Sequence, residues 1–229
     1  LPVIGLAAGP VLVVRRGGIG PHERQRGDGT TDALVAVIGA SGLVAHVVVI
    51  DQGQPFIIPV AYARSDDDVL FHGSSASRLF KQLATGEQST CLSVTLLDGL
   101  VLARSAFESS MNYRSVMVLG IPRLLAGHEK TAALRRISDH LLPDRWNDIR
   151  PPTAQEEKAT IVLSLSLAES SVKVRTGGPE DVPSDLEDPV YRDTWAGEVP
   201  IIDSFTTAVP DSLSLETQVP AYIQQWRRS

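Results

Sequence analysis

The stretch from Val69 to Val118 constrains the fold most, because it joins a short strand pattern to a helix and then to two longer strand patterns. It opens with a β-branched and aromatic run, breaks at Gly73, and continues with serines and an arginine before apolar residues fall at helical spacing. Two further runs, at 89–97 and 111–119, have the composition of strands, and residues 98–99 (Asp-Gly) read as a turn after the first. This order favours a mainly β fold.

The remaining segments repeat the same alternation of strands and turns. Pro59 lies inside one of the strand patterns and favours an edge position or a bulge there, because proline cannot donate to a ladder. A loop is expected at 177–193, which is acidic and rich in proline. Further strands are expected at 43–50, 55–63, 69–72, 159–167, 172–175 and 195–202, and helices at 32–38, 75–84 and from about 127 to 142. Some seven to eight strands with two or three helices predict a closed or partly open antiparallel barrel.

Length, charge and cysteine content exclude several classes of protein. The chain has 229 residues, which suits one domain with extensions. Its net charge of −6 argues against a nucleic-acid surface, which would be strongly basic. A single cysteine, Cys91, leaves no disulfide framework and no cysteine-based metal site, so we expect a reducing, cytoplasmic compartment and no metal. The apolar segment 1–14 is too short to span a bilayer, and no membrane partner is expected.

The turn from Gly73 to Arg78 contains the residue types that hold a phosphate. Unpaired amides at a helix N-terminus attract anions, the serines offer hydroxyls, and the Arg78 guanidinium matches phosphate oxygens. The alternative is that Ser74 or Ser75 only caps the helix and that Arg78 is a solvated surface residue.

Five pieces of the sequence, in this order and spacing, carry a resemblance to a known family: IPVAYAR, LFHGSSASRL, VTLLDGLVLARSAF, MNYRSVMVLG, and KVRTGG ahead of WAGEVP. The chain resembles the flavin-nucleotide-binding proteins of the pyridoxamine 5′-phosphate oxidase-like superfamily. The resemblance implies the FMN-binding split barrel, an antiparallel Greek-key-type β-barrel. It also implies a dimer with FMN in a cleft between the two subunits. It extends over roughly residues 32–203, the expected barrel domain. The Gly-rich, charged composition of 15–31 predicts a flexible N-terminal arm at 1–31, and a tail is expected at 204–229.

The resemblance also implies which residues would bind the cofactor. Those of the phosphate turn are Gly73, Ser74, Ser77 and Arg78. Those of the strand whose backbone follows the flavin ring are Val60, Ala61 and Tyr62, and those of the later strand are Asn112, Arg114 and Ser115. Trp195 is similar to the aromatic residue that covers the site, although it could equally be an anchor for the tail. Leu79 stands where the oxidase has a lysine, so pyridoxamine phosphate oxidation itself is not expected.

His72 is the candidate catalytic residue. It could donate a proton, contact a substrate, or ligate the iron if the site held haem in place of FMN. A strand-end histidine that bonds only to backbone is the other interpretation. Two functions therefore stay open: an FMN-dependent oxidoreductase acting on an unidentified small molecule, and a flavin- or haem-binding module that stores or senses without turnover. In either case few catalytic side chains are needed, because the cofactor carries the redox chemistry.

Overall fold

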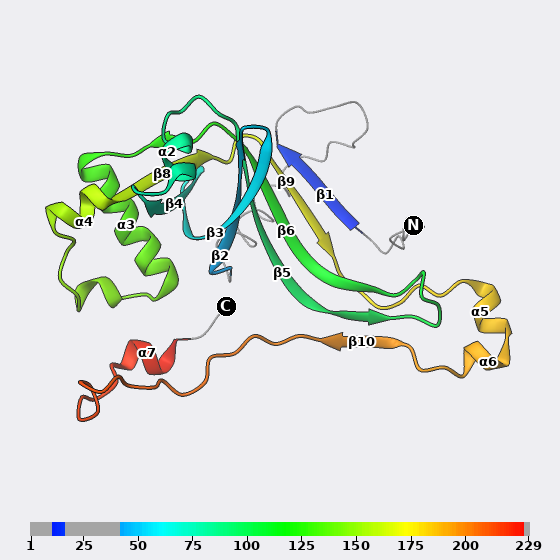
Figure 1. Cartoon of the computed structure of the whole chain (residues 1–229). Helices are drawn as coiled ribbons and strands as arrows, with labels where there is room; N and C mark the ends of the chain where they lie inside the picture. The colour runs from blue at the N-terminus through cyan, green and yellow to red at the C-terminus, as the bar shows by residue number, and fades with distance from the viewer. Residues whose placement is uncertain (1–10, 17–41, 227–229) are drawn as a thin grey trace.

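The structure is a computed structural model that describes residues 11–16 and 42–226. Ten described strands form one sheet in the order β1-β9-β6-β5-β2-β3-β4-β8-β7, and β10 also pairs with β5 (Figure 1). The strands are β1 (Val11–Arg16), β2 (Val44–Asp51), β3 (Gln54–Ser65), β4 (Asp68–Ser74), β5 (Thr90–Leu102), β6 (Ser110–Gly120), β7 (Arg123–Leu124), β8 (Thr160–Ser166), β9 (Ser170–Arg175) and β10 (Gly197–Pro200). Every pairing among them is antiparallel, which confirms the predicted fold class.

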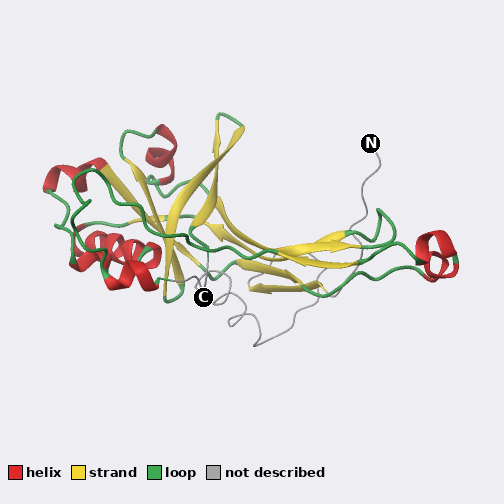
Figure 2. Ribbon diagram, turned by 90° about the horizontal axis from the view of Figure 1, so that it is seen from below, coloured by secondary structure: helices red, strands yellow, loops and turns green. Residues whose placement is uncertain are grey.

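The helices are short apart from one. They are α2 (Arg78–Leu83), α3 (Gly127–Leu141), the 3-10 turn η1 (Arg145–Asn147), α4 (Ala154–Ala159), α5 (Pro183–Glu187), α6 (Pro189–Arg192) and α7 (Ala221–Gln225). Helix α3, the 15-residue exception, lies with η1 and α4 at one end of the elongated molecule, and α5 and α6 lie at the other end (Figures 1 and 2). No helix in the described part of the chain is long and apolar enough to cross a membrane.

The interior of the barrel is filled by its own side chains. Tyr62 of β3, Phe71 of β4 and Leu92 of β5 are fully buried, and Phe80 and Leu83 of α2 pack into the same cluster. Because alternate strand residues point to opposite faces, the inward set comes from every second position of each strand. The sequence alternation therefore reflects a packed interior, and a large cofactor must bind outside it.

A second, smaller cluster lies outside the barrel under α3. Ala133 and Ile137 of this helix pack on Leu70 of β4 and Val162 of β8. These two strand residues face away from the barrel interior, whereas the residues next to them along each strand face into it. Helix α3 ends as expected before Pro143, and its last amide interaction runs from Leu142 N to Ser138 O. This packing covers one face of β4 and β8 and determines what surrounds His72.

Three expectations from the sequence differ from the structure. Residues 98–99 do not turn the chain; they form a β-bulge within the continuous strand β5, where Leu97 pairs with Tyr113 and Gly99 with Asn112. Helices α5 and α6 lie in the segment expected as a loop, each with proline in its first turn, where no amide donor is needed. The helix expected from Ser75 begins at Arg78 instead.

The ends of the chain hold elements that the sequence did not predict. Strand β1 lies within the segment expected as an arm and pairs with β9 over its whole length. Helix α7 lies in the tail beyond residue 203. The helix expected at 32–38 lies outside the described residues.

Gly73 provides a test of the packing at the start of α2. A Cβ at this position would lie 2.3–2.5 Å from ring atoms of Phe80, a residue that is only 4% exposed and cannot easily move away. We expect Gly73→Ala to lower the free energy of unfolding by about 1–3 kcal/mol, as overpacking does. Urea unfolding of the two proteins measures this change in the free energy of unfolding. Gly178→Ala is the matched control, since the nearest atom there, Glu198 Oε1, is 3.7 Å away. Equal stability of wild type and Gly73→Ala would contradict this packing.

Candidate functional site

The phosphate turn connects β4 to α2 on the outside of the barrel. Several of its amides already have internal partners: Ser75 N donates to Ala159 O at 2.8 Å, Ala76 N to Ser74 Oγ at 3.1 Å and Ser77 N to Ser74 O at 3.0 Å. Ser77 caps α2, its hydroxyl accepting from Phe80 N at 3.4 Å. The helix is therefore capped, but by Ser77 and not by Ser74 or Ser75, the two serines considered for that role. What the turn offers an anion is chiefly its hydroxyls and the Arg78 guanidinium.

Arg78 points toward the tip of the β2–β3 hairpin. Its guanidinium forms an ion pair with Asp51 at the end of β2 and lies over the ring of Phe56, 5.9 Å from the centroid. The side chain of Arg78 is 65% exposed, so a second anion can approach it from solvent. Asp51 and Phe56 were not among the residues predicted for the site. The only signal for them is their position beside the hairpin turn.

Strand β3 has an open edge beside this arginine. From Gln54 to Ala61 it pairs with β2, whereas β4 pairs with β3 only from Tyr62 to Ser65. No described strand pairs with the other edge of β3 between residues 54 and 61. Backbone amides and carbonyls of an unpaired edge can bond a planar polar ligand. The side chains of Val60 and Tyr62 point into the core, so only their backbone can serve such a ligand.

Asn112, Arg114 and Ser115 lie on β6, away from Arg78. The guanidinium of Arg114 forms a forked pair with Asp98, with Nη2 to Oδ1 at 2.7 Å and Nε to Oδ2 at 3.0 Å. This hydrogen bond raises the pKa of Arg114. The hydroxyl of Ser115 lies 3.1 Å from that of Thr95 on β5. Arg114 therefore has a fixed orientation, and no sequence pattern identified Asp98 as its partner.

Asn112 is buried rather than available to a ligand. Its amide donates to Glu198 Oε2 at 2.6 Å and its carbonyl accepts from Arg175 Nη1 at 2.7 Å. Both groups of the side chain are therefore engaged within the chain. Trp195 precedes Glu198 by three residues, just before β10, and it is 64% exposed.

A pocket of about 710 Å³ lies beside Arg114, at the gap in β5 between its pairings with β2 and β10. Its lining combines apolar and charged side chains from four segments: Leu43, Val44, His46, Leu97, Asp98, Arg114, Ile201, Ile202 and Asp203. This pocket and the Arg78 ion pair lie at opposite ends of β2. At about 3.3 Å per residue, the strand separates them by about 23 Å. One chain therefore does not bring the predicted site residues together.

His72 lies at the mouth of a different pocket, of about 470 Å³, under α3 and α4. Most of the lining is apolar and comes from α3, η1 and the residues around them: Leu134, Ile137, Leu141, Trp146, Ile149 and Pro152. Burial lowers the pKa of His72, so its ring is neutral at pH 7. Arg150 and Glu156, at the rim, pair with each other at 2.7 Å. The sequence predicted His72 but not the pocket, which depends on how α3 and α4 pack.

Metal-binding and disulfide chemistry find no support among the described residues. No group of three or more His, Cys, Asp or Glu side chains there is arranged to hold a metal ion. Cys91 is a free, partly buried thiol, and burial raises its pKa, which disfavours the reactive thiolate.

Comparison with known proteins places the chain in a family. Residues 30–174 match the family described as pyridoxamine 5′-phosphate oxidase. The structure is similar to the flavocytochrome Anf3 from Azotobacter vinelandii, with 42% identity, a TM-score of 0.78, and coverage of 86% of this chain and 90% of that one. It is also similar to an FAD- and haem-binding protein from Mycobacterium smegmatis, with 30% identity, a TM-score of 0.75, and coverage of 85% and 92%. The search of curated proteins finds no match.

The family match covers more than half of the chain, and the two structural matches extend over most of it. The resemblance drawn from the five sequence pieces is thereby confirmed, and so is the split-barrel fold. The chain belongs to the pyridoxamine 5′-phosphate oxidase-like family.

Proposed function

We propose that this protein binds a flavin nucleotide and uses it for electron transfer. In this proposal the phosphate lies at the turn Gly73–Arg78 and the ring follows the open edge of β3 at Val60–Tyr62. The observation that carries it is the largely exposed side chain of Arg78, which lies close in sequence to two serine hydroxyls and beside an unpaired strand edge. The relatives at 42% and 30% identity are described as a flavocytochrome and an FAD- and haem-binding protein. FMN is the simplest flavin with the required phosphate.

Asp51 sets the condition for binding at Arg78. Its carboxylate pairs with one side of the Arg78 guanidinium, and the remaining N–H groups of the guanidinium are exposed and can donate to phosphate oxygens. A negatively charged cofactor must compete with this carboxylate in a protein of net charge −6. With Leu79 following Arg78, the next residue adds no second cation, so Arg78 carries a large share of the charge pairing.

The proposed site requires a second copy of the chain. In one subunit Arg114 and the Arg78 ion pair lie at opposite ends of β2, Ser115 follows Arg114 on β6, and Trp195 precedes β10. In a homodimer the β6 residues of one copy can face the β3 edge of the other. The outer face of the sheet carries exposed Val44 and Met117 near Ser115, which suits it for such contact. We propose that the flavin lies between the two subunits.

The pocket at His72 is the candidate site for haem, since one relative is described as binding FAD and haem and the other as a flavocytochrome. Its walls are mostly apolar, its volume is several hundred Å³, and it presents a neutral imidazole, the form that ligates iron. Arg150 at the rim could pair with a propionate if it exchanges its present partner Glu156. A bound haem would supply one-electron chemistry. We therefore propose haem as a cofactor in its own pocket, additional to the flavin.

Turnover distinguishes the two functional classes that fit this site. An oxidoreductase would pass electrons between a small-molecule substrate and the flavin, whereas a binding module would hold the cofactor without turnover. Rapid bleaching of the flavin absorbance by a reduced nicotinamide, with reoxidation by an added acceptor, supports the enzyme. We favour the oxidoreductase, because the open edge of β3 would let a substrate approach a flavin bound along it. The expected compartment is the reducing cytoplasm.

Arg78→Ala tests the phosphate assignment. Hydrogen bonds to charged groups contribute roughly 1.5–3 kcal/mol, and each 1.4 kcal/mol is tenfold in affinity, so we expect FMN binding to weaken about 10- to 150-fold. Fluorescence titration of the apoprotein measures this. Arg78→Lys should recover only part of the loss, because an ammonium cannot make the forked contact. Riboflavin, which lacks the phosphate, should bind wild type and Arg78→Ala equally.

Asp51→Asn is the matched variant for the other half of the ion pair. An exposed pair contributes about 0–1 kcal/mol, so its removal should tighten FMN binding by no more than about fivefold. FMN affinity unchanged in Arg78→Ala would mean that the phosphate binds elsewhere. Weaker binding in Asp51→Asn would mean that this carboxylate contacts the cofactor directly.

His72→Ala tests the haem pocket. We expect it to lower haem affinity at least tenfold, seen as loss of the intense blue–violet band, and to leave the flavin content unchanged. Because burial lowers the pKa of His72, the neutral ring persists below the ordinary histidine value, and wild type should keep its haem at pH 6.5. His128→Ala is the control, since this exposed residue in the first turn of α3 lines neither pocket. Normal haem content in His72→Ala would overturn the assignment.

Light scattering tests the shared flavin site. The flavin-loaded protein should have twice the chain mass of 24.6 kDa at micromolar concentration. Its interface should bury roughly 2,000 Å² or more, as obligate homodimers do. A monomer that retains stoichiometric flavin would contradict a site between subunits.

A further inference from the structure

Residues 201–220, which we call the strap, connect β10 to α7 with almost no regular structure. The strap carries apolar side chains that are strongly exposed: Ile202 at 85%, Val209 and Leu213 at 91% each, and Leu215 at 68%. Structureless segments of this length are uncommon in compact domains and usually have a function. No described residue of the same chain covers these four side chains.

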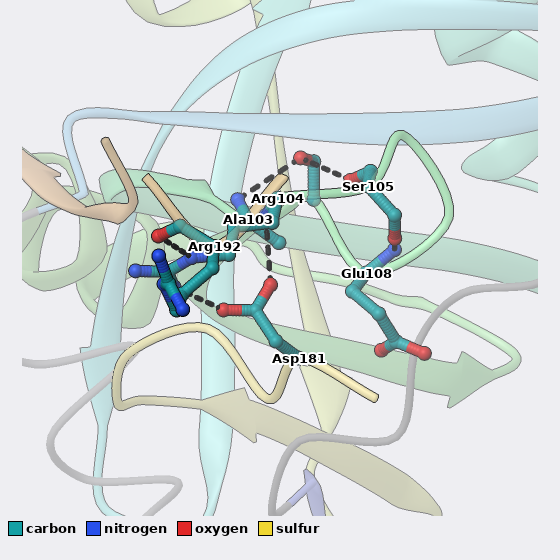
Figure 3. A network of polar contacts seen from close by, with 7 residues as sticks. Ala103, Arg104, Ser105, Glu108, Asp181 and Arg192 are labelled. Atoms are coloured by element: carbon teal, nitrogen blue, oxygen red, sulfur yellow. Dashed lines mark hydrogen bonds and ion pairs between the residues drawn. The ribbon is translucent and has the colours of Figure 1, made fainter. Parts of the chain in front are cut away.

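The chain before the strap is fixed to the tip of the β5–β6 hairpin. Asp181 accepts from the Arg104 amide at 2.7 Å and from its guanidinium at 2.5 Å, and Arg104 Nε donates to Arg192 O at 3.0 Å (Figure 3). The amide hydrogen bond and the guanidinium hold the pKa of Asp181 below its usual value. Strand β10 then pairs with β5, and Ile201 N donates to Asp98 O at 2.9 Å. These contacts set the direction in which the strap leaves the sheet.

The far end of the strap is fixed as well. Tyr222 of α7 donates its hydroxyl hydrogen to Asp148 Oδ2 at 2.6 Å and accepts from Arg145 Nη1 at 3.1 Å. The ring of Phe205 packs against Trp226. The strap therefore begins after β10, near the middle of the molecule, and runs to the helical end, passing below β2 and β3 in Figure 1 without joining the sheet.

Between these ends the strap gains little from its own chain. Within it, the amide of Ser214 donates to Asp211 O and the amide of Thr217 to Ser214 O, so both bonds reach only three residues back. Ordering such a segment costs conformational entropy that exposed apolar side chains cannot offset. A strap with both ends anchored and an apolar middle in solvent is therefore suited to close over another surface.

We propose that the strap closes over a second copy of this chain. This inference rests on the proposed dimer and adds the segment that holds it together. The strap begins at Ile201 and Ile202, which line the pocket beside Arg114, so it leaves from the part of the site that needs the other subunit. A copy bound there lies next to the apolar middle of the strap.

The exposed area is adequate for this role. Fully burying an aliphatic side chain corresponds to roughly 60–120 Å² of apolar area. In a two-fold dimer each strap grips the other copy, so the four side chains contribute twice, or roughly 500–1,000 Å². This is a substantial part of the roughly 1,600 Å² that a standard interface buries.

Photo-crosslinking identifies what the strap touches. A benzophenone amino acid placed at Val209 or Leu213 of the full-length protein, mixed with isotope-labelled copies, should give crosslinks between a light and a heavy chain. The control position is Gln155, an exposed residue on α4, which should give none. Crosslinks that join only residues of the same chain, or none at all, would overturn the proposal.

A charge variant tests the energetics. Val209→Asp with Leu213→Asp should not affect folding of the single chain, because both side chains are exposed there. We expect the dimer dissociation constant to rise about a hundredfold or more, since four apolar contacts are lost. Ser212→Asp is the matched control for added charge. If the flavin-loaded variant dimer has an unchanged dissociation constant, the role of the strap is contradicted and the proposed function is not. If wild type binds no flavin and forms no dimer, the proposed function itself is contradicted.

Discussion

The filled interior of the barrel is the constraint on which the rest of the structure depends. Tyr62, Phe71 and Leu92 leave no room there, so any cofactor must use the outer surface. The same packing sets the path of β4, which leaves β3 at Tyr62 and continues along β8. That divergence opens the edge of β3 beside Arg78. A packed interior and an open strand edge are thus two consequences of one arrangement.

Strand β4 also separates the two proposed cofactor sites. Phe71 points into the barrel, His72 points toward α3, and Gly73 lets the ring of Phe80 approach the backbone closely. One residue further, the chain enters the turn that ends at Arg78. In the proposed function a haem at His72 and a flavin phosphate at Arg78 would lie on either side of this short connection. The rigidity of β4 would then fix both cofactors relative to each other.

The sequence predicted local structure better than it predicted partners. Alternation located the strands because burial of one face leaves a period of two, and Pro143 marked the end of α3. Asp98-Gly99 was misread because a bulge and a turn favour the same residues, and only the pairing partner on β6 distinguishes them. The pairing of Arg78 with Asp51, 27 positions away, depends on how the β2–β3 hairpin curves toward α2. No local pattern encodes that curvature.

The strap shows how a local ion pair can serve a distant contact. Asp181 is 6% exposed and Arg104 23%, so their pair is shielded from solvent far more than the strap that follows it. A shielded pair that bonds an amide and a guanidinium tolerates little rotation. It therefore fixes the chain's direction at the hairpin tip, about twenty residues before the first exposed strap side chain. Preorganisation of this kind lowers the entropy lost on association, because the strap does not have to search for its partner. A segment with so few contacts of its own can then hold a second subunit.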